Sequence, residues 1–429
     1  MARFSPALTT YCLVSGLLTP VVRLMLHRRL KAGKEDAARL NERLGRPARP
    51  RPSGPLVWLH GASVGETVSV LPLVSALIEA GFGVLMTSGT VTSATIAAQR
   101  LPEGAFHQFV PVDTPGAARR FIAHWRPDLA LIAESELWPN LIGAAARSGA
   151  PVAIVNGRMS EKSLRTWRRL PGMIGAVLDD VALVLAQSAA DGARYQALGA
   201  SRVELPGNLK FDVAALGCDA AELATLKAHI GARPVVVIAS THPGEEALML
   251  AAHRTAAERL PGLLTIIAPR HPHRGEPIHA LATTAGLDAA RRSTGETITE
   301  ETALYIADTI GELGLIYRLA PLAVLGGSYI PHGGQNPIEP ARLGVGVLHG
   351  PHVFNFTDVY AAFDAGGGAR LIDDPDRLGG VIAECLAEPA ALAMMSAAAA
   401  ATADGLGGAV ARTMAALAPL LGRARERQA

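Results

Sequence analysis

The sequence predicts an α/β protein with two domains, each built on a parallel sheet with helices on both faces, and an N-terminal membrane-associated segment. Three observations lead to this prediction. Short apolar runs alternate with longer helical patterns from residue 56 onward, which is typical of parallel sheets. The alternation pauses near residues 208–218 and then restarts. An uncharged stretch, residues 4–22, precedes both series.

The first series predicts a domain over residues 51–212. Five apolar runs of strand length lie at 56–60, 84–88, 129–133, 152–155 and 183–186. Helical patterns lie between and after them near 66–80, 90–100, 115–125, 137–148 and 189–198. We therefore expect buried strands that alternate with covering helices.

The second series predicts a domain over residues 233–405, after a linker at 213–232. Its apolar runs lie at 235–239, 264–268, 303–307, 322–325 and 345–348. The Ala-rich end of the chain predicts a helix over 406–429 that packs back on the first domain. Because ligands bind at the carboxyl ends of parallel strands, we expect the two domains to face one central cleft.

The N-terminal residues 1–50 combine an apolar stretch with a basic block. Residues 23–51 contain ten Lys or Arg against three acidic residues, so this segment carries +7 and the remainder −5. About 20 apolar residues can span a bilayer, and positive charge after the stretch predicts that the protein body lies in the cytoplasm. The basic block would attract anionic headgroups. The alternative is an amphipathic helix that packs on the domain.

Composition excludes several classes of protein. The formal net charge of +2 argues against a nucleic-acid binder. The three cysteines, Cys12, Cys218 and Cys385, are far apart and form no CxxC pair, which suits a reducing compartment. The chain is 49% hydrophobic but only 4% aromatic, so Ala, Leu, Val and Ile should build the cores.

Carboxylates follow two predicted strands of the first domain. Glu66 starts a helix after His60-Gly61, and a carboxylate in that position is stabilised as an anion and can accept a proton. Glu134 and Glu136 follow the run at 129–133. Lys210, at the domain junction, could meet a negatively charged ligand group. Taken singly, each has a plainer interpretation: a helix cap, a first-turn charge, or a solvated lysine.

Anion-binding chemistry follows the strands of the second domain. Ser240 to Glu246 carries hydroxyls and backbone amides at a helix start, and Arg270 offers a fork that suits phosphate. Residues 309–313 follow a further strand and could touch a base or ribose. His271 and His273 are tightly spaced around a proline without further ligands, so we do not predict a zinc site.

The segment from Gly333 to Pro340 follows the apolar run at 322–325. Asn336 suits an N-cap and Pro337 the first helical position. A helix start in this place can bind an anion, and Glu339 in its first turn could reach a ribose hydroxyl. The alternative is an ordinary strand–loop–helix corner.

Together, these segments resemble the 3-deoxy-D-manno-octulosonic acid (Kdo) transferase family of lipopolysaccharide biosynthesis. The resemblance covers nearly the whole chain. The segments that carry it are HGASVGE (60–66), ESELWPNLI (134–142), NGRMSEKS (156–163), GNLKFD (207–212), STHPGEE (240–246), APRHPHR (268–274), GGQNPIEPA (333–341) and GPHVFNF (350–356).

The resemblance implies a GT-B glycosyltransferase fold, no metal or other cofactor, and CMP-Kdo as the donor. It assigns Glu66 as the catalytic base, and Glu134 and Lys210 as residues that support the transition state. It assigns CMP binding to a set in the second domain: Pro269, Arg270, Gly311, Glu312, Leu313, Asn336, Pro337, Ile338 and Glu339.

The function that we expect is Kdo transfer to a lipid A precursor, with inversion, on the cytoplasmic side of the bacterial inner membrane. The N-terminal segment would be a single anchor. Two alternatives are a nucleotide-sugar epimerase of the same fold and a non-catalytic membrane scaffold. Neither the number of Kdo units nor the oligomeric state follows from the sequence.

Overall fold

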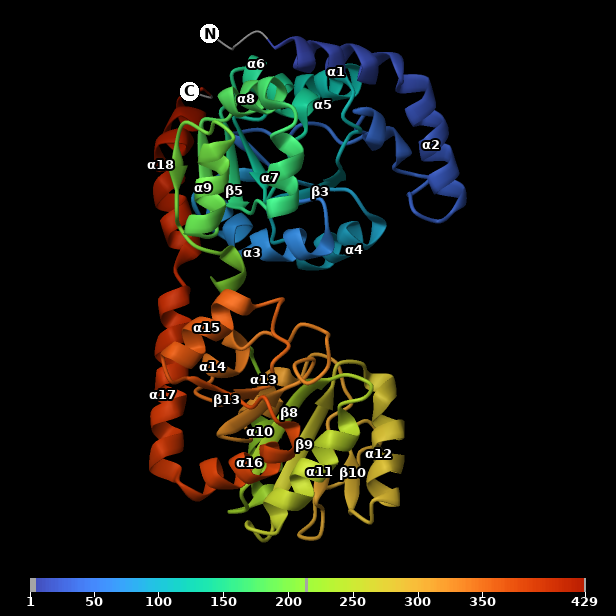
Figure 1. The fold of residues 1–429 in the computed structure, drawn as a ribbon. Helices are drawn as coiled ribbons and strands as arrows, with labels where there is room; N and C mark the ends of the chain where they lie inside the picture. The colour runs from blue at the N-terminus through green and yellow to red at the C-terminus, as the bar shows by residue number, and fades with distance from the viewer. Residues whose placement is uncertain (1–4, 213–214, 428–429) are drawn as a thin grey trace. The chain divides into compact units, whose positions relative to one another are not determined.

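The chain divides into two compact units, each with its own sheet. A computed structural model describes residues 5–212 and 215–427. The first unit takes in residues 1–213 and 406–429, and the second takes in residues 214–405. Each unit is built on a seven-stranded sheet (Figure 1). The predicted α/β class with two parallel sheets is confirmed.

In the first unit all strand pairs are parallel, in the order β3-β2-β1-β4-β5-β6-β7. The strands are β1 (Leu56–His60), β2 (Gly83–Ser88), β3 (Ala105–Phe109), β4 (Leu129–Ala133), β5 (Val152–Gly157), β6 (Leu183–Ala186) and β7 (Val203–Glu204). The helices between them are α3 (Val64–Glu79), α4 (Val91–Arg100), α5 (Pro115–Trp125), α6 (Pro139–Arg147), α7 (Glu161–Trp167), α8 (Pro171–Asp179) and α9 (Ala189–Ala197).

The core of this unit lies on both faces of the sheet. Trp58 of β1 packs in one cluster with Phe121 of α5. Leu59, the next residue, belongs to the cluster on the other face with Val70 of α3 and Leu417. Since both faces are covered, all five residues of β1 are buried, and the strand reads as an almost continuous apolar run.

In the second unit the strand pairs are also parallel, in the order β10-β11-β9-β8-β12-β13-β14. The strands are β8 (Val235–Thr241), β9 (Leu264–Pro269), β10 (Ala289–Arg291), β11 (Leu304–Ile306), β12 (Leu322–Leu325), β13 (Gly346–His349) and β14 (Ala369–Leu371). The helices are α10 (Ala220–Ile230), α11 (Glu246–Ala257), α12 (Gly275–Thr284), α13 (Leu313–Tyr317), α14 (Ile338–Ala341), α15 (Thr357–Ala365), α16 (Leu378–Ala387) and α17 (Pro389–Leu406).

The sequence predicted the inner strands of both sheets and missed their edges. Each of the ten predicted strands forms, and all ten lie inside a sheet. The strands that were missed, β3, β7, β10 and β14, are the four edges of the described sheets. An edge strand has one neighbour and more solvent contact, so its sequence carries polar residues and loses the apolar signal. Helices α7 and α8 were also not predicted.

The interpretation of residues 213–232 as a linker is wrong over Ala220–Ile230, because these residues form α10. Asp219 caps that helix by accepting hydrogen bonds from the backbone N–H groups of Ala221 and Glu222 at 2.8 and 3.0 Å. The apolar side chains Leu226 and Ile230 are buried. Residues 213 and 214 lie outside the described part of the chain.

The N-terminal segment forms two helices, α1 (Pro6–Leu17) and α2 (Thr19–Lys31), bent by 59° relative to each other. Only when taken together do they reach the length and apolar character of a membrane span. Helix α1 packs on α5, α6 and α8 of the first unit, where the Tyr11 hydroxyl donates to Asp113 at 2.9 Å. Apolar side chains of α1 and α2 and of the residue between them are exposed: Leu13, Val14, Leu17, Leu18, Val21, Leu24 and Met25.

The C-terminal helices α17 and α18 (Ala409–Glu426) form a second stretch with the length and apolar character of a membrane span. Packing accounts for the apolar character of α18. Leu417, Leu420 and Ala424 are buried in the core cluster of the first unit beside α3 (Figure 1). The Arg412 side chain holds the start of this helix by donating to the backbone carbonyl of Pro206 at 2.7 Å.

Candidate active site

Three carboxylates gather at one edge of the first sheet. Strands β1 and β4 are parallel neighbours, so their carboxyl ends emerge side by side. Glu66 lies in the helix that follows β1, and Glu134 and Glu136 directly follow β4. Burial raises the pKa of Glu136, and the charges of Glu66 and then Glu134 raise it further. The structure therefore brings together the acidic residues that the sequence singled out here.

Glu66 forms a capping box at the start of α3. Its backbone N–H donates to Ser63 Oγ at 3.3 Å. In return, its two carboxylate oxygens accept from the backbone N–H of Ala62 and from Ser63 Oγ, each at 2.8 Å. These bonds fix the direction of the carboxylate. A carboxylate has further lone pairs, and Glu66 is only half-buried, so it can still accept a proton.

Glu134 is held in an unusual backbone conformation, with φ of +53°. Residues other than glycine rarely adopt this backbone conformation. It costs conformational free energy and persists only where surrounding contacts enforce it. The contacts are present: the Glu134 N–H donates to the carbonyl of Val155 at 3.0 Å, and the Tyr195 hydroxyl donates to the Glu134 carbonyl at 2.7 Å. The Glu134 side chain accepts a hydrogen bond from Lys210 Nζ at 3.1 Å.

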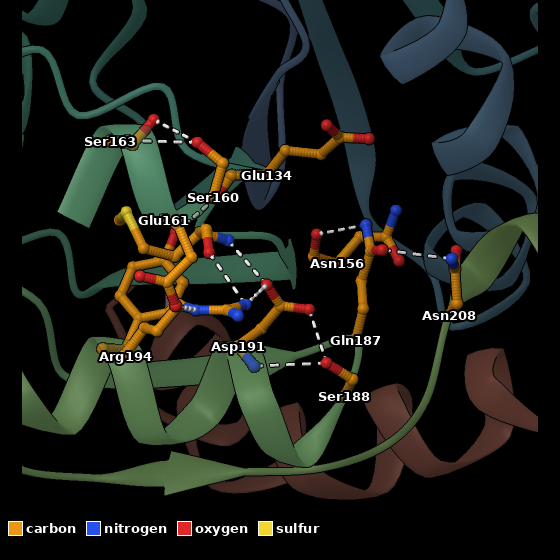
Figure 2. Close-up of polar contacts among 12 residues, drawn as sticks. Glu134, Asn156, Ser160, Glu161, Ser163, Gln187, Ser188, Asp191, Arg194 and Asn208 are labelled. Carbon is orange, nitrogen blue, oxygen red and sulfur yellow. Dashed lines mark hydrogen bonds and ion pairs between the residues drawn. The ribbon is translucent and has the colours of Figure 1, made fainter. Parts of the chain in front are cut away.

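Lys210 lies on a short 3₁₀ helix, Leu209–Asp212, which amide side chains hold in place. The N–H of Leu209 donates to Asn156 Oδ1 at 2.9 Å. Gln187 donates to the carbonyl of Asn156 at 2.9 Å and accepts from Asn208 Nδ2 at 3.1 Å. Figure 2 shows Asn156, Gln187 and Asn208 side by side. This network presents Lys210 to Glu134.

Sequence reasoning missed Asn156 and Gln187. Asn156 has φ of +51° and lies in β5, whereas Gln187 directly follows β6. Both strands lie beyond β4 in the sheet. Their position at the ends of predicted strands could have identified them, because each amide lies where a parallel strand reaches the same edge of the sheet as Glu134.

In the second unit a cavity of about 110 Å³ brings together most of the predicted CMP-binding set. Its wall includes Ser240, Pro269, Arg270, Gly311, Glu312 and Leu313. The Arg270 side chain is exposed, and its backbone N–H donates to the carbonyl of Thr241 at 3.0 Å. A phosphate at this edge would therefore meet the guanidinium of an arginine whose backbone is hydrogen-bonded to the last residue of β8.

Glu312 is fixed by a residue that the sequence did not single out. Arg292 binds both of its carboxylate oxygens, at 2.6 and 2.5 Å, and also binds Glu222 at 2.9 Å. The hydrogen bonds from Arg292 hold the pKa of Glu312 below its usual value. Arg292 directly follows β10, an edge strand that was not predicted.

The segment from Asn336 to Glu339 differs in detail from the prediction. Helix α14 begins at Ile338 and has four residues, with Pro337 as its cap instead of its first residue. Asn336 Oδ1 accepts from the N–H of Ile338 at 3.1 Å, and its amide donates to Glu339 at 3.3 Å. Burial raises the pKa of Glu339, while the charge of Arg270 lowers it, so these two predicted residues share one neighbourhood.

Four histidines also gather at this edge. The rings of His242 and His332 contact each other at an angle of 37°, with centroids 3.7 Å apart, and the ring of His271 lies 6.2 Å from that of His242 and 5.6 Å from that of His273. Over residues 5–212 and 215–427, no group of three or more His, Cys, Asp or Glu has an arrangement that could hold a metal ion.

Comparison with known proteins identifies relatives along almost the whole chain. A family model described as 3-deoxy-D-manno-octulosonic-acid transferase (kdotransferase) matches residues 38–213. The 3-deoxy-D-manno-octulosonic acid transferase of Bordetella pertussis is 39% identical over 430 residues, which cover 96% of this chain and 99% of that protein. The corresponding protein of Haemophilus influenzae is 33% identical over 75% of this chain and 77% of its own length.

Solved structures agree on the fold. A glycosyltransferase from Rickettsia africae matches with a TM-score of 0.58 and 10% identity, over 86% of this chain and 99% of that chain. The UDP-GlcNAc 2-epimerase from Neisseria meningitidis matches with a TM-score of 0.54 and 12% identity, over 80% and 94%. The GT-B type of architecture is therefore shared by transferases and epimerases, and sequence identity decides the family. The chain belongs to the 3-deoxy-D-manno-octulosonic acid transferase family.

Proposed function

We propose that this Kdo transferase moves Kdo from CMP-Kdo to a lipid A precursor (lipid IVA), a phosphorylated and acylated glucosamine disaccharide, and inverts the anomeric centre. The observation that carries the chemistry is the carboxylate cluster of the first unit, in which Glu66 has no ion-pair partner among the described residues and keeps lone pairs to accept a proton, while Glu134 is paired with Lys210. Relatives named as Kdo transferases support the sugar.

Glu66 would act as the general base. It takes the proton from a sugar hydroxyl of the acceptor as that oxygen forms a bond to the anomeric carbon of Kdo. The bond from that carbon to the phosphate oxygen breaks, and CMP leaves with the electron pair. A single displacement of this kind inverts the anomeric centre. The capping box supports this role because it aims the carboxylate before the acceptor binds.

The second unit would hold the donor. Arg270 offers positive charge, and the neighbouring histidines offer hydrogen-bond donors, to the phosphate, whose negative charge grows as the bond breaks. We propose that these groups suffice without a metal ion. Glu312, aligned by Arg292, and Glu339 would accept hydrogen bonds from the nucleoside.

The N-terminal helices would keep the enzyme at the cytoplasmic side of the bacterial inner membrane. One side of α1 is occupied by the first unit, while apolar side chains on α1 and α2 are exposed. The same segment carries Arg23, Arg28, Arg29 and Lys31. Exposed apolar residues beside cations suit a surface of anionic lipid, where the acceptor would also lie.

Incubation of the purified full-length protein with CMP-Kdo and a tetraacylated lipid A precursor tests the proposal. The expected result is release of CMP and a lipid product heavier by one or more Kdo residues in mass spectrometry. Conversion of a nucleotide sugar in the absence of lipid would instead indicate the epimerase. A protein that neither releases CMP nor changes the lipid would indicate a scaffold and contradict the proposal.

A further inference from the structure

His242 is fixed on three sides in the second unit. Its backbone N–H donates to Glu245 Oε2 at 3.0 Å, and its carbonyl accepts from the N–H of Glu245 at 3.1 Å. The same carboxylate accepts from the backbone N–H of Gly327 at 2.7 Å and from that of Tyr329 at 3.1 Å. Glu245 therefore joins the loop after β8 to the loop after β12.

The ring of His242 is fixed as well. It contacts the tilted ring of His332, and its Nε2 lies 3.1 Å from the amide nitrogen of Gln335. The Gln335 backbone is itself held, because its carbonyl accepts from the Tyr360 hydroxyl at 2.8 Å. Gly327, with φ of +66°, lies against this group: a β-carbon there would approach His242 Cδ2, His332 Cδ2 and Gln335 Nε2 to 3.4 Å.

These contacts determine which ring nitrogen carries the proton. An amide nitrogen can only donate, so His242 Nε2 accepts, and in the neutral ring the proton is on Nδ1. Burial first, and then the charges of His332, His271 and Arg270, lower the pKa of His242 to about 4, so the ring is neutral near pH 7. The edge with Cδ2 and Nε2 faces Gly327 and Gln335, so Nδ1 lies on the opposite edge.

We propose that His242 is a donor-binding residue whose Nδ1–H donates a hydrogen bond to an oxyanion of the bound nucleotide sugar, either its phosphate or its sugar carboxylate. His242 is only 7% exposed, yet no hydrogen bond found among the described residues uses Nδ1. Adjacent Thr241 has a buried hydroxyl without a hydrogen-bond partner in the described structure, and Ser240 has φ of +59°. Strain and unused polar groups in one loop suit a site that a ligand completes.

Arg270 supports the choice of an oxyanion. Its backbone is bound to Thr241, and its charge acts on the His242 ring. Ser240 and Arg270 also share the wall of the 110 Å³ cavity that contains most of the predicted nucleotide-binding residues. The inference rests on the proposed function, because it takes the ligand to be a CMP-linked acidic sugar.

Two substitutions separate the ring nitrogens. The amide nitrogen of Asn reaches the place of Nδ1, whereas that of Gln reaches the place of Nε2. Calorimetry with CMP and with cytidine, and KM for CMP-Kdo, are compared for His242→Asn, His242→Gln and the control His229→Asn on α10. We expect His242→Asn to stay within about threefold of the wild type and His242→Gln to lose about tenfold, the usual effect of one hydrogen bond.

The ligand series identifies the oxyanion. If His242→Gln weakens the binding of CMP but not that of cytidine, Nδ1–H donates its hydrogen bond to the phosphate. If His242→Gln raises only the KM for CMP-Kdo and leaves CMP affinity unchanged, Nδ1–H donates its hydrogen bond to the sugar carboxylate. If Asn and Gln both behave like the wild type, or if Gln retains more affinity than Asn, the inference is wrong. A wild-type protein that binds no CMP would instead refute the proposed function.

A spectroscopic measurement keeps the inference testable if a variant folds poorly. In long-range ¹H–¹⁵N spectra of ¹⁵N-histidine-labelled wild-type protein, the His242 signals should show a protonated Nδ1 and an unprotonated Nε2. Gln335→Met, which removes the amide that selects this tautomer, should mix the two forms and weaken binding severalfold. A wild-type ring protonated on Nε2 would overturn the assignment.

Discussion

Lys210 Nζ lies 3.1 Å from Glu134 Oε1, and this ion pair joins residues that are 76 positions apart in the sequence. The Lys210 side chain is 37% exposed and that of Glu134 is 14% exposed. An ion pair with this much solvent contact contributes little to folding. The ion pair matters because it places a cation beside the cluster of carboxylates that contains Glu66.

Lys210→Met should therefore reduce turnover far more than stability. We expect kcat to fall about 10²- to 10³-fold, as for the loss of one group that stabilises a transition state, while the free energy of unfolding changes by less than about 1 kcal/mol. Steady-state kinetics and denaturant unfolding measure the two effects, with Lys162→Met on α7 as the control. A variant with normal turnover would show that Lys210 only neutralises Glu134.

Arg270 should contribute to CMP affinity through both its charge and its fork. Arg270→Ala loses both, and we expect CMP to bind about 10- to 100-fold more weakly, since hydrogen bonds to charged groups are the strong ones. Arg270→Lys keeps the charge and should lose less. Calorimetry compares both with Arg377→Ala, an exposed arginine of the same unit. If both variants at position 270 keep the wild-type affinity, CMP binds elsewhere.

The reaction should proceed in excess EDTA. Arg270 supplies the positive charge, and the histidine cluster supplies the hydrogen bonds, that a metal would otherwise offer to the leaving phosphate. Rates with and without chelator should agree within experimental error. A loss of turnover that Mg²⁺ or Mn²⁺ restores would mean that this part of the mechanism is wrong.

Membrane binding should depend on the exposed apolar side of α1 and α2. Leu17 and Val21 are 79% and 59% exposed, so Leu17→Glu/Val21→Glu should weaken flotation with anionic vesicles without affecting the fold. Deletion of residues 1–30 should release much of the protein, and high salt should detach the rest, because the remaining attraction to residues 31–51 is screened. Met394→Glu, equally exposed but in the second unit, is the control.

Turnover on detergent-solubilised acceptor should survive both N-terminal changes, because Glu66 and the nucleotide loops are untouched. If the double variant and the truncated protein float as the wild type does at low and high salt, another surface binds the bilayer.

The sequence could predict the inner strands of both sheets because burial on two faces makes such strands continuously apolar. It could also place Glu66, Glu134 and Arg270 near strand ends, since each lies within six residues after an apolar run. The sequence could not predict contacts between segments that are far apart along the chain. Nothing local pairs Arg292 with Glu312, or His242 with Gln335 93 positions later.

The N-terminal segment illustrates the same limit. Its composition predicted a membrane segment or a helix packed on the domain as alternatives. The structure packs one side of α1 on the first unit and leaves other apolar side chains of α1 and α2 exposed, so packing on the domain is observed and membrane association stays a prediction. Composition averages over those sides and cannot separate them.

The central claim is that Glu66 is the general base, and Glu66→Gln tests it most directly. The measurement is single-turnover transfer from CMP-Kdo to the tetraacylated lipid A precursor, alongside Glu79→Gln on the same helix as the control. Gln retains the shape and one acceptor of the capping box but cannot take the proton. We expect the rate to fall about 10²- to 10⁴-fold, with CMP affinity and thermal midpoint close to those of the wild type. A rate within a few fold of the wild type would show that Glu66 only caps α3.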